Sequence, residues 1–175
     1  MEPIQNTSSE RVSPIAQYIQ KIIHFFGSIA AYSTIALVGL ITLDVATRYI
    51  FNITYNWVIE LEWHLFGIIF LLGAAYTLQQ DKHVRVDLFY SQWSRKRQIW
   101  IDLFGTLFLL IPWCVLSIRT AYHYAINAWY MKEGSPNPNG IPAWYPIKFA
   151  IVLGFVLLLL QGILMIFQYL KRHGN

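Results

Sequence analysis

Residues 149–170 read FAIVLGFVLLLLQGILMIFQYL, a stretch of 22 residues without a charged side chain. An α-helix rises about 1.5 Å per residue, so this stretch is long enough to cross the roughly 30 Å hydrocarbon core of a bilayer. Working towards the N-terminus, three more apolar stretches of similar length follow. The predicted spans cover about 25–48, 57–78, 99–124 and 146–170. The sequence therefore predicts an all-α membrane protein with four transmembrane helices.

The composition of the chain agrees with a bilayer environment. Of its 175 residues, 56% are hydrophobic and only 13% are charged, whereas a soluble domain carries roughly a quarter charged residues. The net charge is +4. The basic residues sit at span ends and in one loop and form no stripe on a soluble fold, so we expect no nucleic-acid binding.

The distribution of basic residues predicts the orientation in the membrane. The predicted organisation is a tail over residues 1–21, a transmembrane domain over 22–170 and a short C-terminus over 171–175. The tail, the loop between the second and third spans, and the C-terminus together hold most of the lysines and arginines. Because basic segments stay on the cytoplasmic side, both termini are expected in the cytoplasm.

The segment between the second and third spans is too polar to cross a membrane. Over Val84–Gln98 apolar residues alternate loosely with charged ones, which predicts a short amphipathic helix on the membrane surface or on a partner. An ordinary basic loop is the alternative. Within this segment Arg95, Lys96 and Arg97 are expected near anionic lipid headgroups.

Several ionisable residues fall inside the predicted spans, where charge is costly. Asp44 and Arg48 lie four residues apart, on one face of the first helix. The turn that follows is short, so the first two helices form a hairpin, and Arg48 is predicted to pair with Glu60 across it. We interpret Arg48, Glu60 and Asp44 as a structural ion-pair group, with a proton or cation site as the alternative.

No motif in the sequence indicates an enzyme. There is no P-loop, no HExxH and no Gly-x-Ser-x-Gly, and no catalytic, substrate-binding or metal site is predicted. A membrane haem would need two histidines on different helices at matching depth, and His24, His64 and His123 are not expected to form such a pair. A haem or quinone membrane anchor of a respiratory complex remains the alternative function.

Short motifs spread over nearly the whole chain resemble one known family. They are Arg48-Tyr49, Phe51-Asn52, Trp57, Glu60-Leu61, Gly73-Ala74-Ala75, His83-Val84-Arg85-Val86-Asp87, Gly140-Ile141-Pro142-Ala143-Trp144 and Gly154-Phe155. In order and spacing they resemble the small membrane subunit (Q subunit, DctQ-like) of tripartite ATP-independent periplasmic (TRAP) transporters. Glu62 and His64 give the second helix more polar groups than this pattern needs.

The resemblance implies a function and a set of partners. A periplasmic binding protein captures an organic acid, of the sialic-acid or C4-dicarboxylate class, and a large membrane subunit (M subunit) imports it with sodium. The small subunit enlarges the fixed scaffold of the large one in the bacterial inner membrane, binds no cofactor itself, and leaves sodium to the large subunit. The candidate partner-interface or motif residues are Trp57, His83, Arg85, Asp87, Pro142 and Trp144.

Overall fold

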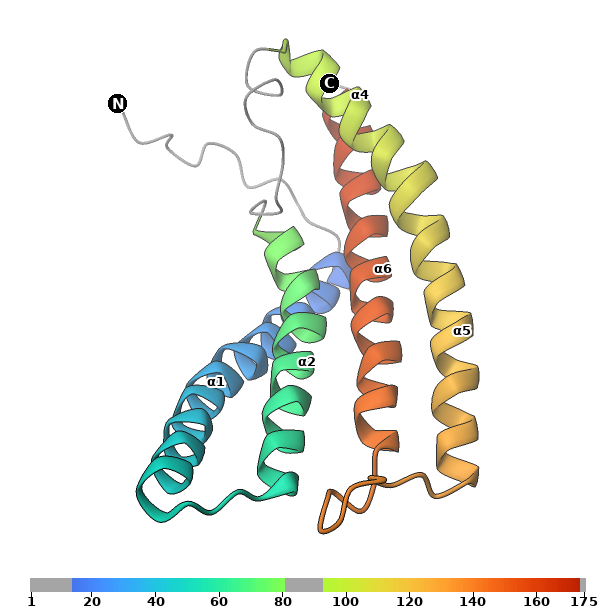
Figure 1. Ribbon diagram of the computed structural model, residues 1–175. Coiled ribbons are helices and arrows are strands. Elements are labelled where there is room, and N and C mark those ends of the chain that lie inside the picture. Colours follow the sequence, from blue (N-terminus) through green and yellow to red (C-terminus); the bar gives the residue numbers. More distant parts are fainter. Residues whose placement is uncertain (1–13, 81–92, 174–175) are drawn as a thin grey trace, which may run out of the picture.

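The computed structural model describes residues 14–80 and 93–173, and these form a helical layer (Figure 1). The helices are α1 (Pro14–Phe51), α2 (Asn56–Gln79), α4 (Arg95–Gly105), α5 (Ile111–Tyr130) and α6 (Tyr145–His173). A π-helical segment, Thr106–Leu110, joins α4 to α5 into one continuous rod. Within the described ranges, four helical rods are long and apolar enough to cross a membrane. The predicted all-α membrane fold with four transmembrane helices is confirmed.

The rods lie in the order α1, α2, α6, α5. The two hairpins, α1 with α2 and α5 with α6, pack together through α2 and α6, which run parallel (Figure 1). The flanking rods bury little: 11% of the most apolar window is buried in α1 and in α4–α5, against 28% in α2 and 33% in α6. The outer rods therefore present long apolar faces away from the bundle.

Small residues let the helix backbones approach each other. A side chain at Gly154 of α6 would place its Cβ 2.9 Å from the backbone oxygen of Leu71 on α2, and one at Gly27 of α1 would clash with the Tyr76 ring. Ala75 on α2 is fully buried. Without a hydrophobic driving force between helices in lipid, such close backbone contact is what favours association.

Pro112 lies within the third span, where a proline is expected to kink the helix or to be accommodated by its neighbours. Proline lacks the N–H that would donate to the carbonyl four residues earlier, and its ring crowds that carbonyl. The π-helical turn at Thr106–Leu110 directly precedes this proline, and the wider turn relieves the crowding. The rod continues through the proline without a break.

The observed helices extend beyond the predicted spans. α1 begins at Pro14, so residues 14–21, predicted as tail, are helical. Residues 81–92 lie outside the described part of the chain, and they include most of the predicted amphipathic helix and the motif residues His83, Arg85 and Asp87. At its other end that segment runs into α4, which begins at Arg95.

Candidate functional site

The most connected polar group of the described residues lies at the end of the bundle that carries two loops. Residues 52–55 join α1 to α2, and residues 131–144 join α5 to α6, at the same end of the bundle (Figure 1). We call this end the loop end and the opposite one the terminal end. The Asn56 amide donates a 2.9 Å hydrogen bond to the backbone oxygen of Pro138, which ties the start of α2 to the longer loop.

Glu60, one turn into α2, is the centre of this region. Its side chain is buried, with 3% of its surface exposed. One carboxylate oxygen accepts hydrogen bonds from the Ser135 hydroxyl and, at 2.9 Å, from the Asn137 amide. The other accepts from the backbone N–H of Ile141 at 2.7 Å and from the Trp144 indole N–H at 3.4 Å. Four donors from a single loop thus converge on one carboxylate.

The loop is shaped to close around that carboxylate. Its ends are held by a hydrogen bond from the Trp144 N–H to the Glu133 oxygen at 2.8 Å. A Cβ at Gly140 would lie 2.7 Å from a Glu60 oxygen and closer still to Ser135, and one at Gly134 would lie 2.6 Å from the backbone oxygen of Pro142. Glycine is therefore required at both positions for the loop to pack this tightly.

Helix α5 ends in a Schellman motif, and the 131–144 loop follows directly. Lys132 adopts a left-handed conformation with φ of 48°. The Glu133 N–H donates to the Ala128 oxygen at 2.9 Å and the Lys132 N–H to the Trp129 oxygen at 3.2 Å. These bonds satisfy carbonyls that the helix end would leave unpaired.

A buried cation joins the last turns of α5 to the first turn of α6. Lys148 is 4% exposed. Its ammonium lies 2.5 Å from the Glu133 carboxylate and 3.7 Å from the centre of the Tyr124 ring. The ion pair and the cation–π contact compensate for burying the charge.

Aromatic side chains line the same level of the bundle. Trp144 packs edge-on against Trp63, with ring centres 5.5 Å apart, and Trp129 against Tyr145 at 4.7 Å. Trp57 is half-exposed beside Tyr55. Tryptophan and tyrosine favour the membrane–water interface, and their clustering marks the loop end as one such interface.

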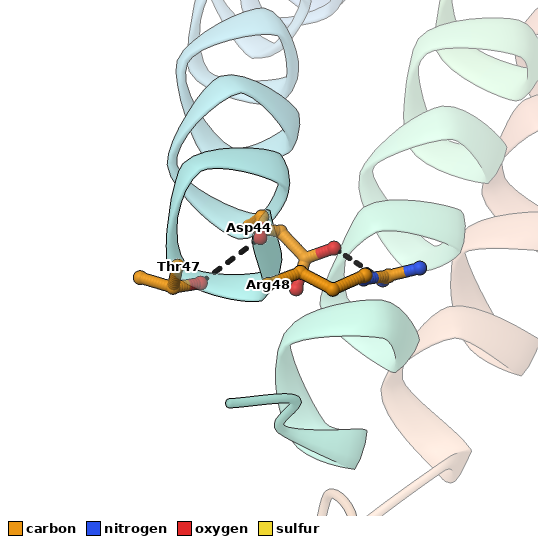
Figure 2. Close-up of polar contacts among 3 residues, drawn as sticks. All are labelled: Asp44, Thr47 and Arg48. Carbon is orange, nitrogen blue, oxygen red and sulfur yellow. Dashed lines mark hydrogen bonds and ion pairs between the residues drawn. The ribbon is translucent and has the colours of Figure 1, made fainter. Parts of the chain in front are cut away.

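The predicted pairing of Arg48 with Glu60 is wrong. Arg48 instead forms an ion pair with Asp44 on its own helix, one turn earlier (Figure 2). Both oxygens of Glu60 accept hydrogen bonds from the loop, so the carboxylate is satisfied without the Arg48 guanidinium. A partner four residues away on a preformed helix face is also reached with less loss of conformational freedom than one on a second helix.

Two polar residues whose role the sequence left open lie near these groups. Glu62 is within electrostatic range of Asp44 and Arg48. One oxygen of Asp44 and one of Glu62 are buried without a hydrogen-bond donor among the described residues. The His64 Nδ1 donates to the backbone oxygen of Glu60 at 2.6 Å, so its ring braces the first turns of α2.

The other histidines are separate from this cluster. The His24 ring packs against Tyr76, and the His123 ring lies beside Tyr122. Over residues 14–80 and 93–173, no group of three or more histidine, cysteine, aspartate or glutamate side chains is arranged to hold a metal ion. The contacts at the loop end hold the 131–144 loop against α2 and against the start of α6.

Several residues of this site had no role in the sequence analysis. Ser135 and Asn137 belong to the stretch GSPNPNG, whose glycines and prolines indicate a loop but assign no role to its side chains. The signal available was its density of serine and asparagine, residues that donate side-chain hydrogen bonds in turns. The motif residue Trp144 does contribute to the Glu60 site, whereas Pro142 is exposed to solvent or lipid.

The chain was compared with models of protein families. The family described as "Tripartite ATP-independent periplasmic transporters, DctQ component" matches residues 37–172. The matched region starts within α1 and contains the whole Glu60 site. Comparison with curated proteins finds no match.

Proposed function

The chain belongs to the DctQ component family of TRAP transporters, and we propose that it stabilises and enlarges the scaffold of a large membrane subunit that imports an organic acid with sodium. The family match over most of the chain is the observation that carries this proposal. It favours a transporter subunit over a haem or quinone anchor, which no contact of the described histidines supports.

The distribution of polar groups supports an accessory role. Among the described residues, the buried charged side chains are Asp44, Glu60 and Lys148, and each is held at or near the loop end by the contacts above. Deeper in the bundle the buried polar side chains, Thr106 and Gln161, are uncharged. Secondary transporters usually build their sites from broken helices near the bilayer midplane, and the four rods are continuous there.

The exposed surfaces support a role as a companion of a larger membrane protein. The flanking rods, α1 and the continuous α4–α5 rod, present large apolar side chains such as Tyr32, Phe108 and Trp113. Such faces suit lipid and helix contacts alike. Because family members function with a large membrane subunit, we propose that part of this surface is covered by it.

We propose that the loop end faces the periplasm and the terminal end the cytoplasm of a bacterial inner membrane. The excess of basic residues toward the terminal end supports this orientation. Arg95, Lys96 and Arg97 lie in the first turn of α4, where they would meet cytoplasmic headgroups. The clamped 131–144 loop would then lie beside the docked periplasmic binding protein.

Reconstitution in liposomes tests the proposal. The chain alone should give no sodium-driven uptake of sialic acid or of a C4-dicarboxylate. The chain with the large subunit and the loaded binding protein should give uptake of one class in a sodium gradient and none in a potassium gradient. Uptake by the isolated chain, or full uptake when the chain is omitted, would overturn the accessory role.

A further inference from the structure

We propose that the outward face of α5, defined by Arg119, His123 and Asn127, docks against a transmembrane helix of the large transporter subunit that carries a carboxylate level with Arg119. This inference rests on the proposed function, because it names the face by which the chain meets that subunit.

The three residues share one side of α5 and point away from the bundle. All three are exposed, at spacings of four residues that place them on a common helix face. The packing side of α5 is formed by Cys114, Ala125 and Ala128, each no more than 1% exposed. Since α5 is at one edge of the layer (Figure 1), the polar face is open to whatever surrounds the protein.

Arg119 has no partner among the described residues. Across the part of the chain that the structure describes, its guanidinium takes part in no hydrogen bond or ion pair. The neighbouring Thr120 hydroxyl is satisfied by the Leu116 carbonyl at 2.9 Å. The arginine is therefore the unpaired charge of this helix face.

The depth of Arg119 follows from contacts between α5 and α6. Tyr124 is level with Lys148, through their cation–π contact, and Asp102 is level with Tyr169, through a 3.3 Å hydrogen bond. The stretch of α6 after Lys148, residues 149–170, has no charged side chain and marks the hydrocarbon level. Arg119 lies five residues before Tyr124, or about 7.5 Å deeper.

The direction of α5 makes it harder for the Arg119 side chain to reach the headgroups at the loop end. In a helix the Cα–Cβ bonds tilt toward the N-terminus. The N-terminal side of α5 is the deeper side for Arg119, because the helix runs toward the loop end. The side chain thus starts out pointing into the hydrocarbon, and reaching the headgroups would require it to bend back.

A carboxylate on a neighbouring helix fits these constraints. Charged residues within spans almost always pair or face protein, and a guanidinium with five donors matches a carboxylate through two parallel hydrogen bonds. His123 and Asn127 extend the polar face by two more turns toward the interface. The large subunit is the partner that the family supplies at this depth.

Photocrosslinking tests the docking face without altering the arginine. Leu116 is exposed and lies one turn before Arg119 on α5, further from the loop end. A photoreactive amino acid at this position should give an adduct with the co-expressed large subunit. The same amino acid at Val38, exposed on α1, is the control and should give less. The full complex is used in both cases.

Matched arginine variants test the charge. Arg119→Gln should reduce the large subunit recovered with the tagged chain at least about tenfold, because the partner carboxylate loses its pair. Arg97→Gln, an exposed arginine at the far end of the same rod, should leave recovery unchanged. Arg119→Lys, which keeps the charge, should retain more of the large subunit than Arg119→Gln.

The outcomes separate the docking face from the proposed function. Adducts from Val38 but not Leu116, only lipid adducts at Leu116, or normal recovery with Arg119→Gln would overturn the docking face while leaving the subunit assignment intact. Failure of the unaltered chain to recover the large subunit would overturn both.

Discussion

The Glu60 carboxylate on α2 accepts a 2.7 Å hydrogen bond from the backbone N–H of Ile141, 81 residues later in the chain. This contact joins the two helical hairpins at the loop end. Every residue except proline at position 141 keeps this backbone donor, so the contact is best tested by changing Glu60. The geometry of the 131–144 loop therefore depends on one side chain of another helix.

Replacing Glu60 should loosen this loop. Glu60→Ala removes the acceptor for four donors, and those of the partly buried Ser135, Ile141 and Trp144 then lose a hydrogen bond that water replaces incompletely. We expect faster thiol labelling of a cysteine placed at Pro136 and a lower midpoint of thermal unfolding in detergent, while Glu60→Gln, which keeps one carbonyl acceptor, has a smaller effect. Glu133→Gln is the control: it removes a carboxylate at the loop end that pairs with Lys148 and accepts no hydrogen bond from the Glu60 donors. An unchanged labelling rate in Glu60→Ala would show that the loop holds its shape without the carboxylate.

The Asp44–Arg48 ion pair predicts that substitutions of these two residues affect stability non-additively, whereas substitutions of Arg48 and Glu60 do not. Arg48→Gln should destabilise the protein by about 1–2 kcal/mol, because it strands a buried carboxylate although the arginine itself is half-exposed. Adding Asp44→Asn should recover part of that loss. Adding Glu60→Gln should give only the sum of the two single effects. Equilibrium unfolding in mixed micelles measures the stability of the single variant and of both double variants. If adding Glu60→Gln recovered stability, the pairing of Arg48 with Glu60 across the hairpin would be supported after all.

Two glycines predict opposite responses to alanine. Gly154→Ala places a Cβ 2.9 Å from the Leu71 backbone oxygen and should destabilise the α2–α6 contact by about 1–3 kcal/mol. Gly39→Ala meets nothing within 4 Å and should be neutral or stabilising by up to about 1 kcal/mol, since alanine is the better helix former. The unfolding midpoints of the two variants, compared directly, check both. Equal effects would mean that close approach of α2 and α6 contributes little.

The orientation predicts which residues an impermeant thiol reagent reaches. In a Cys114→Ala background, single cysteines at Tyr55 or Pro136 should react in intact cells, because both lie in loop-end segments. A cysteine at Ser94, before α4, should react only after the membrane is opened. Reaction at Ser94 in intact cells would reverse the topology.

The basic first turn of α4 predicts retention of anionic lipid. Replacing Arg95, Lys96 and Arg97 together by glutamine should reduce the anionic lipid that copurifies with the chain, since each basic residue near a charged surface contributes about 1 kcal/mol. Far-ultraviolet circular dichroism should remain that of a helical protein. Unchanged lipid content would show that these residues do not meet headgroups.

The sequence by itself determined the four spans. A bilayer requires every backbone group of a span to be paired internally, so a long uncharged stretch such as 149–170 has no structure open to it but a helix. Length and hydropathy are local properties, and they predicted the number of spans and the hairpin of the first two helices. Hydropathy also marked Glu60, Asp44 and Arg48 as charges that need partners. The resemblance to the DctQ family came separately, from the order and spacing of short motifs.

Only the tertiary structure decided which partners those charges take. Glu60 is satisfied by donors from a loop more than 70 residues away, and Arg48 by Asp44 on its own helix. Hydropathy gives the depth of a residue but not the direction in which it faces, so several pairings at one depth look alike in sequence. The choice among them depends on how closely the backbones approach, and that is set by small residues such as Gly140 and Gly154, whose missing side chains let the loop and the helices pack together.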